Sequence, residues 1–301
     1  MTTTAASTSD TGKPVDMRDD NSTRRRLLVA LKYPKGIIGL SLVGGFAFLA
    51  TLAPLIIPES LSTAIDITAR LSPPSFDHIL GTDKLGRDLF FRVLLGAKSS
   101  LLISVSAVVL MICLGLPVGL IAGYFRGWTD LLLMRIVDSM LSFPVLVFAL
   151  AIAAILEPNL RNTVIAIGIA FSPYLARVVR AETLRVSALP FVEAARAVGS
   201  SHLRIIVTNI IPNIMGPVIV QATISVAFAI LTEAGLSFLG LGTQPPTPSW
   251  GLMIQSSRSY LDVAPWTALV PGMAIALSVL GLNMLGDVLR DALDPRLRVD
   301  R

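Results

Sequence analysis

Long runs of apolar residues without charge, separated by short polar segments, dominate the pattern of this chain. A membrane-spanning helix needs about 20 consecutive apolar residues, and the runs near or above this length predict six spans. They cover residues 36–57, 99–123, 139–156, 162–176, 205–232 and 263–286. The fourth run is short, so we expect its helix to continue into an amphipathic end. The pattern predicts an all-α membrane protein with six transmembrane helices.

The composition agrees with this fold class. The chain is 53% hydrophobic and 15% charged, whereas a soluble domain carries about 25% charged residues. Six spans place both termini on the same side, and Lys and Arg concentrate in cytoplasmic segments. With the N-terminus inside, the inner segments hold 18 of the 25 basic residues and the outer segments hold 7. We predict an N-in/C-in topology, and we attribute the net charge of +5 to topology and anionic lipid, with no nucleic-acid partner.

The polar segments divide the chain. Residues 1–23 are rich in Thr, Ser and Asp, and such a sequence buries too little apolar surface to fold, so we expect a disordered cytoplasmic tail over residues 1–33. Residues 34–291 form the six-span domain, with an outer loop over 58–98 and a cytoplasmic loop over 177–208. Residues 292–301 form a cytoplasmic C-terminal tail. The single cysteine, Cys113, lies in an apolar run and excludes a disulfide within the chain.

The cytoplasmic loop carries a pattern that predicts a short helix. Pro190 suits a first helical turn, the alanines favour helix, and Gly199 followed by two serines would end it. The small alanine side chains would let another protein approach closely, and Glu193 can pair with a basic residue. The alternative is an ordinary amphipathic loop. The candidate residues for contact with a partner protein are Glu193, Ala194, Ala195, Arg196 and Gly199.

The outer loop contains a second candidate site. Its glycines suit tight turns, and its aspartates are candidate N-caps of short helices. We therefore predict an ordered cap, because a flexible tether would be richer in flexible polar residues. An arginine here can fork onto a carboxylate, within the cap or across an interface. The candidate residues are Gly81, Asp83, Gly86, Arg87 and Asp88.

Four separated motifs carry a resemblance to a known family. The Glu-Ala-Ala run, with Gly199 and the Ile-Pro pair at 211–212, resembles the EAA loop of bacterial ABC importer permeases. The string at 81–88, the segments at 232–242 and 248–251, and the ending at 285–296 are similar to the "C" subunit of dipeptide and oligopeptide importers. Nickel and glutathione permeases are relatives in that branch. One departure is Asn209, where a His is common.

The resemblance, which covers roughly residues 24–298, implies a type I ABC importer permease of the bacterial inner membrane. Such a subunit forms half of a pathway that works by alternating access, for dipeptides or oligopeptides, with nickel and glutathione as alternatives. The implied partners are a second homologous permease, two ABC ATPase subunits and an external substrate-binding protein. The ATPases would contact the 193–199 segment and the binding protein the 81–88 segment.

Other classes of protein find little support in the residues. The chain has no phosphate-binding loop and no nucleophile elbow, and His78 and His202 have no companions at metal-ligand spacing. We therefore expect no catalytic residue, no metal and no cofactor in this chain, since ATP and Mg would bind the partner subunits. A stand-alone secondary transporter or channel would need mid-membrane acids or paired broken half-helices, and the middle of each run lacks an acid.

Two further features have open interpretations. Glu233 lies near the outer end of the fifth span, where an ionisable group is costly and usually functional. It would either line the pathway as a gate residue or pin an outer helix in place. Gly115, Gly119 and Gly123 repeat every four residues and allow close helix packing, either within the subunit or against a second permease.

Overall fold

The computed structural model describes residues 33–56 and 58–293. The predicted N-terminal tail, apart from Tyr33, and residues 294–301 of the predicted C-terminal tail lie outside the described residues. The elements are helices, and β pairing within the described ranges is limited to an isolated bridge between Thr82 and Asp88. The helices are α2 (Pro34–Ile56), α3 (Glu59–Thr63), η1 (Ile67–Ala69), α4 (Leu89–Phe125), α5 (Gly127–Leu141), α6 (Val145–Ile155), α7 (Leu160–Ser187), α8 (Pro190–Ala197), α9 (His202–Ile205), η2 (Ile206–Ile210), α10 (Ile211–Phe238), α11 (Trp250–Ser257), η3 (Arg258–Tyr260) and α12 (Trp266–Leu293).

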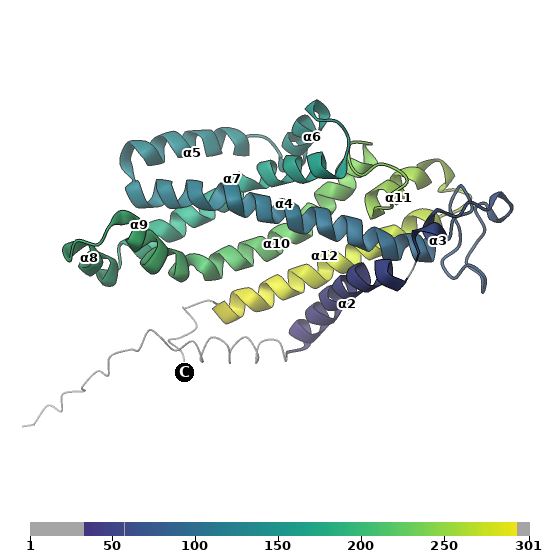
Figure 1. Ribbon diagram of the computed structural model, residues 1–301, viewed down its shortest axis with the longest axis horizontal. Coiled ribbons are helices and arrows are strands. Elements are labelled where there is room, and N and C mark those ends of the chain that lie inside the picture. Colours follow the sequence, from purple (N-terminus) through teal and green to yellow (C-terminus); the bar gives the residue numbers. More distant parts are fainter. Residues whose placement is uncertain (1–32, 57, 294–301) are drawn as a thin grey trace, which may run out of the picture.

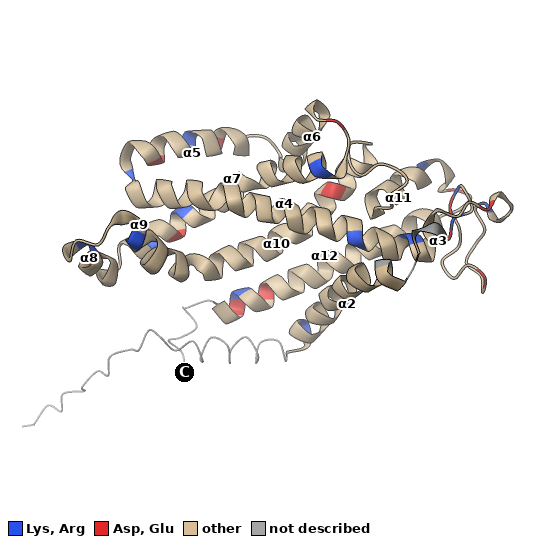
Figure 2. Ribbon diagram, viewed as in Figure 1, with Lys and Arg blue, Asp and Glu red and all other residues tan. Residues whose placement is uncertain are grey.

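The long helices run side by side along the longest axis of the molecule (Figure 1). α4 packs on α7, α10 packs on both α7 and α12, and α2 lies against α4 and α12. α8 and α9 lie at one end, and residues 58–88, which we call the cap and which include α3, lie at the other with α11 nearby. α2 begins and α12 ends toward the α8 end, as expected if both termini share a side. Charged residues gather toward the two ends, and the middle of α10 and α12 is uncharged (Figure 2).

Within the described residues, five helices are long and apolar enough to span a membrane, and the predicted third span, 139–156, is not one helix. It is divided between α5 and α6, which meet at an angle of 89°. Pro144 explains the break, because proline has no N–H to continue the helix and keeps Phe143 before it out of helical geometry. A six-span count holds if the bent pair is one span. It is the one broken span found among the described helices, whereas a secondary transporter would need two in matching positions.

α5 begins before the predicted span because it is an amphipathic helix tied to α7 by ion pairs. Arg180 of α7 donates from Nε to Asp130 at 2.5 Å and from a terminal nitrogen at 2.6 Å. Arg177 donates to Asp138 at 2.5 Å. Asp130 and Asp138, which precede the predicted span at 139–156, therefore lie inside α5, which packs on α7.

Both predicted long loops are shorter than expected because helices extend into them. α4 begins at Leu89, so the outer loop ends at 88 and not at 98. Arg92 and Lys98, which marked the expected boundary, belong to α4. At the other end α7 runs to Ser187, as its expected amphipathic extension requires, and α8 and α9 occupy much of the remaining cytoplasmic loop.

The glycine stripe of α4 packs within the chain. A Cβ at Gly115 would lie 2.6 Å from the Ser172 carbonyl oxygen, and one at Gly119 would lie 2.5 Å from the Ala176 oxygen. A Cβ at Gly123 would meet the Thr183 side chain at 2.7 Å. These contacts confirm the close helix packing that the stripe predicts. Because α7 occupies this face, a second permease cannot.

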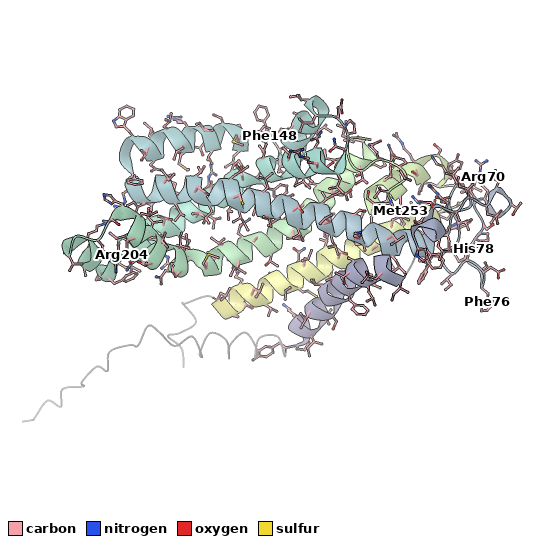
Figure 3. The ribbon with its side chains drawn as sticks, viewed as in Figure 1. Arg70, Phe76, His78, Phe148, Arg204 and Met253 are labelled. Atoms are coloured by element: carbon pink, nitrogen blue, oxygen red, sulfur yellow. The ribbon has the colours of Figure 1, made fainter. Side chains whose placement is uncertain are left out.

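The opposite positions of α8 and the cap allow a direct test of the topology. In a Cys113→Ser background, a membrane-impermeant thiol reagent should label Phe76→Cys in intact cells but label Arg196→Cys only after permeabilisation. Phe76 is fully exposed at the far tip of the cap (Figure 3) and suits this purpose. Trp250 also lies near the cap end, but its side chain is buried, so this position is not suited to labelling. Labelling at position 196 in intact cells would reverse the predicted topology.

Candidate functional site

The short helix predicted around the Glu-Ala-Ala run is present as α8. Pro190 occupies its first turn, and buried Val192 anchors it in the main core. At its end Gly199 has a φ of 79°, a left-handed conformation that glycine adopts without strain. Its N–H donates to the Arg196 carbonyl at 3.0 Å, and the next N–H donates to the Ala195 carbonyl at 3.1 Å. This pair of bonds is a Schellman motif.

The anchoring of α8 leaves one face of the helix open. Glu193 and Ala194 are exposed, Ala195 is half-buried, and Val198 just after the helix is 81% exposed. Glu193 forms no ion pair with any residue in the described part of the chain. The face therefore offers one carboxylate and small side chains to a partner.

A cluster of rings beside α8 joins the end of α4 to α8 and α9, which are distant from α4 in sequence. The Tyr124 hydroxyl, at the end of α4, lies 2.9 Å from Nδ1 of His202 in α9. The Arg196 guanidinium lies over the Tyr124 ring, 5.2 Å from its centroid. With Phe125 and Arg126, these residues line an open hollow of about 320 Å³. His202 has no companion at metal-ligand spacing in the sequence, and no spacing signal connects it to Tyr124.

The cap is organised around Asp83. One carboxylate oxygen accepts the backbone N–H groups of Leu85 and Arg87 at 2.8 and 3.0 Å. The other oxygen accepts a hydrogen bond from Nε of Arg87 and pairs with a terminal nitrogen of the same guanidinium, each at 2.7 Å. It also lies 3.5 Å from Nε of Arg92. Asp83 therefore closes a turn, and the prediction that it caps a helix is wrong. The N-cap prediction is confirmed for Asp88, which accepts the Phe90 N–H of α4 at 2.8 Å.

The predicted turns of the cap are also present. Gly81 and Gly86 have φ values of 77° and 73°, and a Cβ at Gly86 would lie 1.7 Å from the Asp66 carbonyl oxygen. Asp66 itself caps η1, where hydrogen bonds from the Thr68 hydroxyl and N–H lower the pKa of its carboxyl. These contacts make the cap an ordered structure, as predicted.

Arg87 therefore acts inside the cap rather than as a free docking group. If the chain takes part in import, as the resemblance implies, we expect Arg87→Ala to reduce uptake by the same factor at every concentration of an external binding protein, because the change loosens the turn around Asp83. Lys84→Ala, next to this turn, is the matched control. Uptake in reconstituted liposomes across a range of binding-protein concentrations measures the effect. A loss confined to low concentrations would instead assign Arg87 to docking.

Glu233 of α10 is the centre of a buried polar cluster. Its side chain is 0% exposed and accepts hydrogen bonds from Ser237 at 2.8 Å and from Ser100 of α4 at 3.3 Å. Ser249, the N-cap of α11, lies beside the same carboxylate. We call Ser100, Glu233, Ser237 and Ser249 the Glu233 cluster. A fully enclosed carboxylate contacts no open pathway. The geometry therefore favours a role in which Glu233 holds the outer helices together over a role as a gate residue in the pathway.

α11 is held to the same cluster by its tryptophan. The Trp250 backbone N–H donates to the Ser100 hydroxyl at 3.3 Å, and its indole N–H donates to the Val93 carbonyl at 3.0 Å. A Cβ at Gly251 would lie 2.7 Å from Ala234 of α10. The two segments at 232–242 and 248–251, noted separately in the sequence, thus form one packed unit with α4.

The described residues contain no group of three or more His, Cys, Asp or Glu side chains placed to hold a metal ion. His78 instead lies 2.9 Å from Asp88 within the cap, and His202 contacts Tyr124. The candidate sites are thus the exposed face of α8, the ordered cap and the Glu233 cluster.

Comparison with known proteins places these features in a family. The model of the family described as "Binding-protein-dependent transport system inner membrane component" matches residues 115–299. The dipeptide transport system permease protein DppC of Alkalihalophilus pseudofirmus is 44% identical over 286 residues, covering 95% of this chain and 94% of that protein. The di/tripeptide permease protein DppC of Pseudomonas aeruginosa is 46% identical, covering 83% and 84%.

More distant matches agree on the fold. The glutathione transport system permease protein GsiD of Pectobacterium atrosepticum is 40% identical, covering 82% of each chain. A structure of the inward-facing MetNI methionine ABC transporter has a TM-score of 0.57 at 17% identity and covers 68% of this chain and 98% of the matched chain. The expected type I permease architecture is thus confirmed. This multi-pass membrane protein belongs to the family of binding-protein-dependent transport system inner membrane components.

Proposed function

We propose that this chain is one permease subunit of an ATP-driven importer in a bacterial inner membrane. It forms half of the translocation pathway for dipeptides or oligopeptides, together with a second, homologous permease. Two ABC ATPase subunits bind and hydrolyse ATP on the cytoplasmic side, and an external substrate-binding protein delivers the cargo. This chain itself hydrolyses nothing.

The observation that carries this proposal is the exposed face of α8 at the end of the bundle opposite the ordered cap (Figure 1). An ATP-driven importer needs a contact for its ATPases on one side of the membrane and a contact for its binding protein on the other. The anchored helix with Glu193 and Ala194 exposed supplies the first. The cap, fixed by Asp83 and Arg87, supplies the second.

The mechanism follows from how these parts are connected. Closure of the ATPases on ATP would move α8, and α8 is joined by short links to α7 and, through α9 and η2, to α10. The bundle would then exchange an inward-open for an outward-open arrangement, and the partner's binding energy would bias which one is populated. Cargo released by the binding protein enters in the outward-open state.

Peptide cargo is supported by relatives named for dipeptide and di/tripeptide transport at 44% and 46% identity. Glutathione is the second candidate, because relatives named for its transport are 40% and 42% identical. Glutathione is itself a tripeptide, so both candidates share amide and carboxylate chemistry.

Reconstitution tests the proposal. The chain should co-purify with two ATPase subunits and a second permease, and liposomes containing the complex should accumulate labelled dipeptide only with ATP and binding protein. Competition with unlabelled glutathione separates the two cargoes. Uptake that persists without ATPase subunits would support a stand-alone transporter and overturn the proposal.

A further inference from the structure

We propose that Tyr124, His202 and Arg196 form a clamp that ties the coupling helix α8 to the end of α4, so that movement of α8 is passed directly to the α4–α7 pair. We call these three residues the Tyr124 clamp. This inference rests on the proposed function, because a clamp of this kind has a role only where a partner moves α8.

The clamp supplies a link that the backbone lacks. Among the described elements, α8 packs mainly against α7 and α9, and its chain connections lead to α7 and α10. Tyr124 lies 78 residues before His202, at the last turn of α4. Side chains therefore make the connection between α4 and the α8–α9 unit.

The geometry uses three contacts on one ring. The Tyr124 hydroxyl bonds Nδ1 of His202 at 2.9 Å, and the Arg196 guanidinium covers the ring face at 5.2 Å. Phe125 closes the side, with its ring 5.1 Å from Tyr124 and 5.8 Å from His202. Tyr124 is buried, whereas Arg196 and His202 are exposed. The tyrosine ring is therefore covered by side chains from both α8 and α9.

Arg196 is committed to this contact. It makes no ion pair with a described carboxylate, and a guanidinium over an aromatic face is attracted by the ring's quadrupole. A lysine would stack less well because its ammonium is compact and strongly hydrated. Arg196 is thus a positioning residue that joins α8 to α4, while Glu193 remains free for the partner.

The α4 end of the clamp leads into the close contact between α4 and α7. Gly115, Gly119 and Gly123 bring α4 onto the α7 backbone at distances that leave no room for a Cβ. Two helices packed in this way move as one body, because close-packed interiors do not deform continuously. A displacement of α8 would therefore reach α4 and α7 together through Tyr124.

The test measures cargo transported per ATP hydrolysed by the full complex in liposomes, with assembled complex quantified. Tyr124→Phe removes the hydroxyl bond and keeps the ring, and His202→Ala removes the partner. Each should lower the ratio several-fold without reducing assembly. The double variant should be no worse than His202→Ala alone, since the two act through one bond. Arg204→Ala, an exposed change on α9 (Figure 3), is the matched control and should leave the ratio unchanged.

A rescue experiment separates clamping from general stability. In a Cys113→Ser background, Tyr124→Cys with His202→Cys should uncouple the complex, and a short bifunctional thiol reagent should restore coupling. If the wild-type complex shows no cargo-linked ATP hydrolysis, the proposed function fails. If the wild type couples and the variants couple equally well, or lose activity only in proportion to lost complex, or are not restored by the reagent, the clamp is overturned while the proposed function stands.

Discussion

Glu193→Lys is expected to abolish uptake while the subunit stays in the membrane. The residue lies on the exposed face of α8, outside the long apolar helices, so the change should not disturb insertion. A partner that offers a basic group to Glu193 would meet a like charge, and losing an interfacial charge pair costs about 2–5 kcal/mol. A cost at the low end already weakens assembly more than tenfold, since about 1.4 kcal/mol corresponds to a factor of ten. Co-purification of the ATPases and ATP-dependent uptake measure the two effects.

Glu182→Lys is the matched control for this prediction. Glu182 makes an ion pair with Arg185 along α7 at 2.7 Å, and both side chains are partly exposed. Such pairs contribute about 0–1 kcal/mol, so this reversal should leave uptake nearly unchanged. Normal assembly and normal uptake of the Glu193→Lys complex would remove α8 from the coupling role.

The spans and the short helices were predictable because they depend on local sequence. Charge-free runs mark the long helices. Pro190 and Gly199 mark the two ends of α8, and Asp88 marks the start of α4. The third predicted span is not one continuous helix, and the sequence hid the reason. Pro144 breaks the helix, and the composition of residues 139–156 conceals this because the run is apolar on both sides of the break. The start of α4 was placed too late because Arg92 is charged. Arg92 nevertheless lies within α4, where it is buried and donates to the Ser62 carbonyl.

The candidate sites were predictable only where their members are close in sequence. Asp83 and Arg87 are four residues apart and bond as a pair, and the proposal of a fork within the cap required no tertiary information. Tyr124 and His202 are joined only by the packing of α4 beside α9. Ser100, Glu233 and Ser249 likewise come from three segments that meet when α4, α10 and α11 pack. No spacing rule predicts such contacts, because they depend on the folded arrangement.

Glu233→Ala is expected to destabilise the outer half of the bundle and to reduce uptake through that loss. The change removes the acceptor shared by the hydroxyls of Ser100 and Ser237, and each buried O–H donor left without an acceptor costs about 1–3 kcal/mol. It also leaves a cavity where the side chain is 0% exposed, which adds a further penalty. Thermal unfolding of the purified complex should shift to lower temperature, and the amount of folded subunit should fall with it.

Glu233→Gln distinguishes pinning from a pathway role. A glutamine amide has both an acceptor oxygen and donor hydrogens, so it can bond Ser237 and Ser100 from the same position and keep α4, α10 and α11 together. If Glu233 pins these helices, this variant should retain most of the thermal stability and most of the uptake that Glu233→Ala loses. If Glu233 instead attracts the amino group of a peptide, removing its charge should abolish uptake while the stability stays normal. Uptake and unfolding measured on both variants decide between the two roles, and a stable but inactive Glu233→Gln complex would contradict the anchoring role.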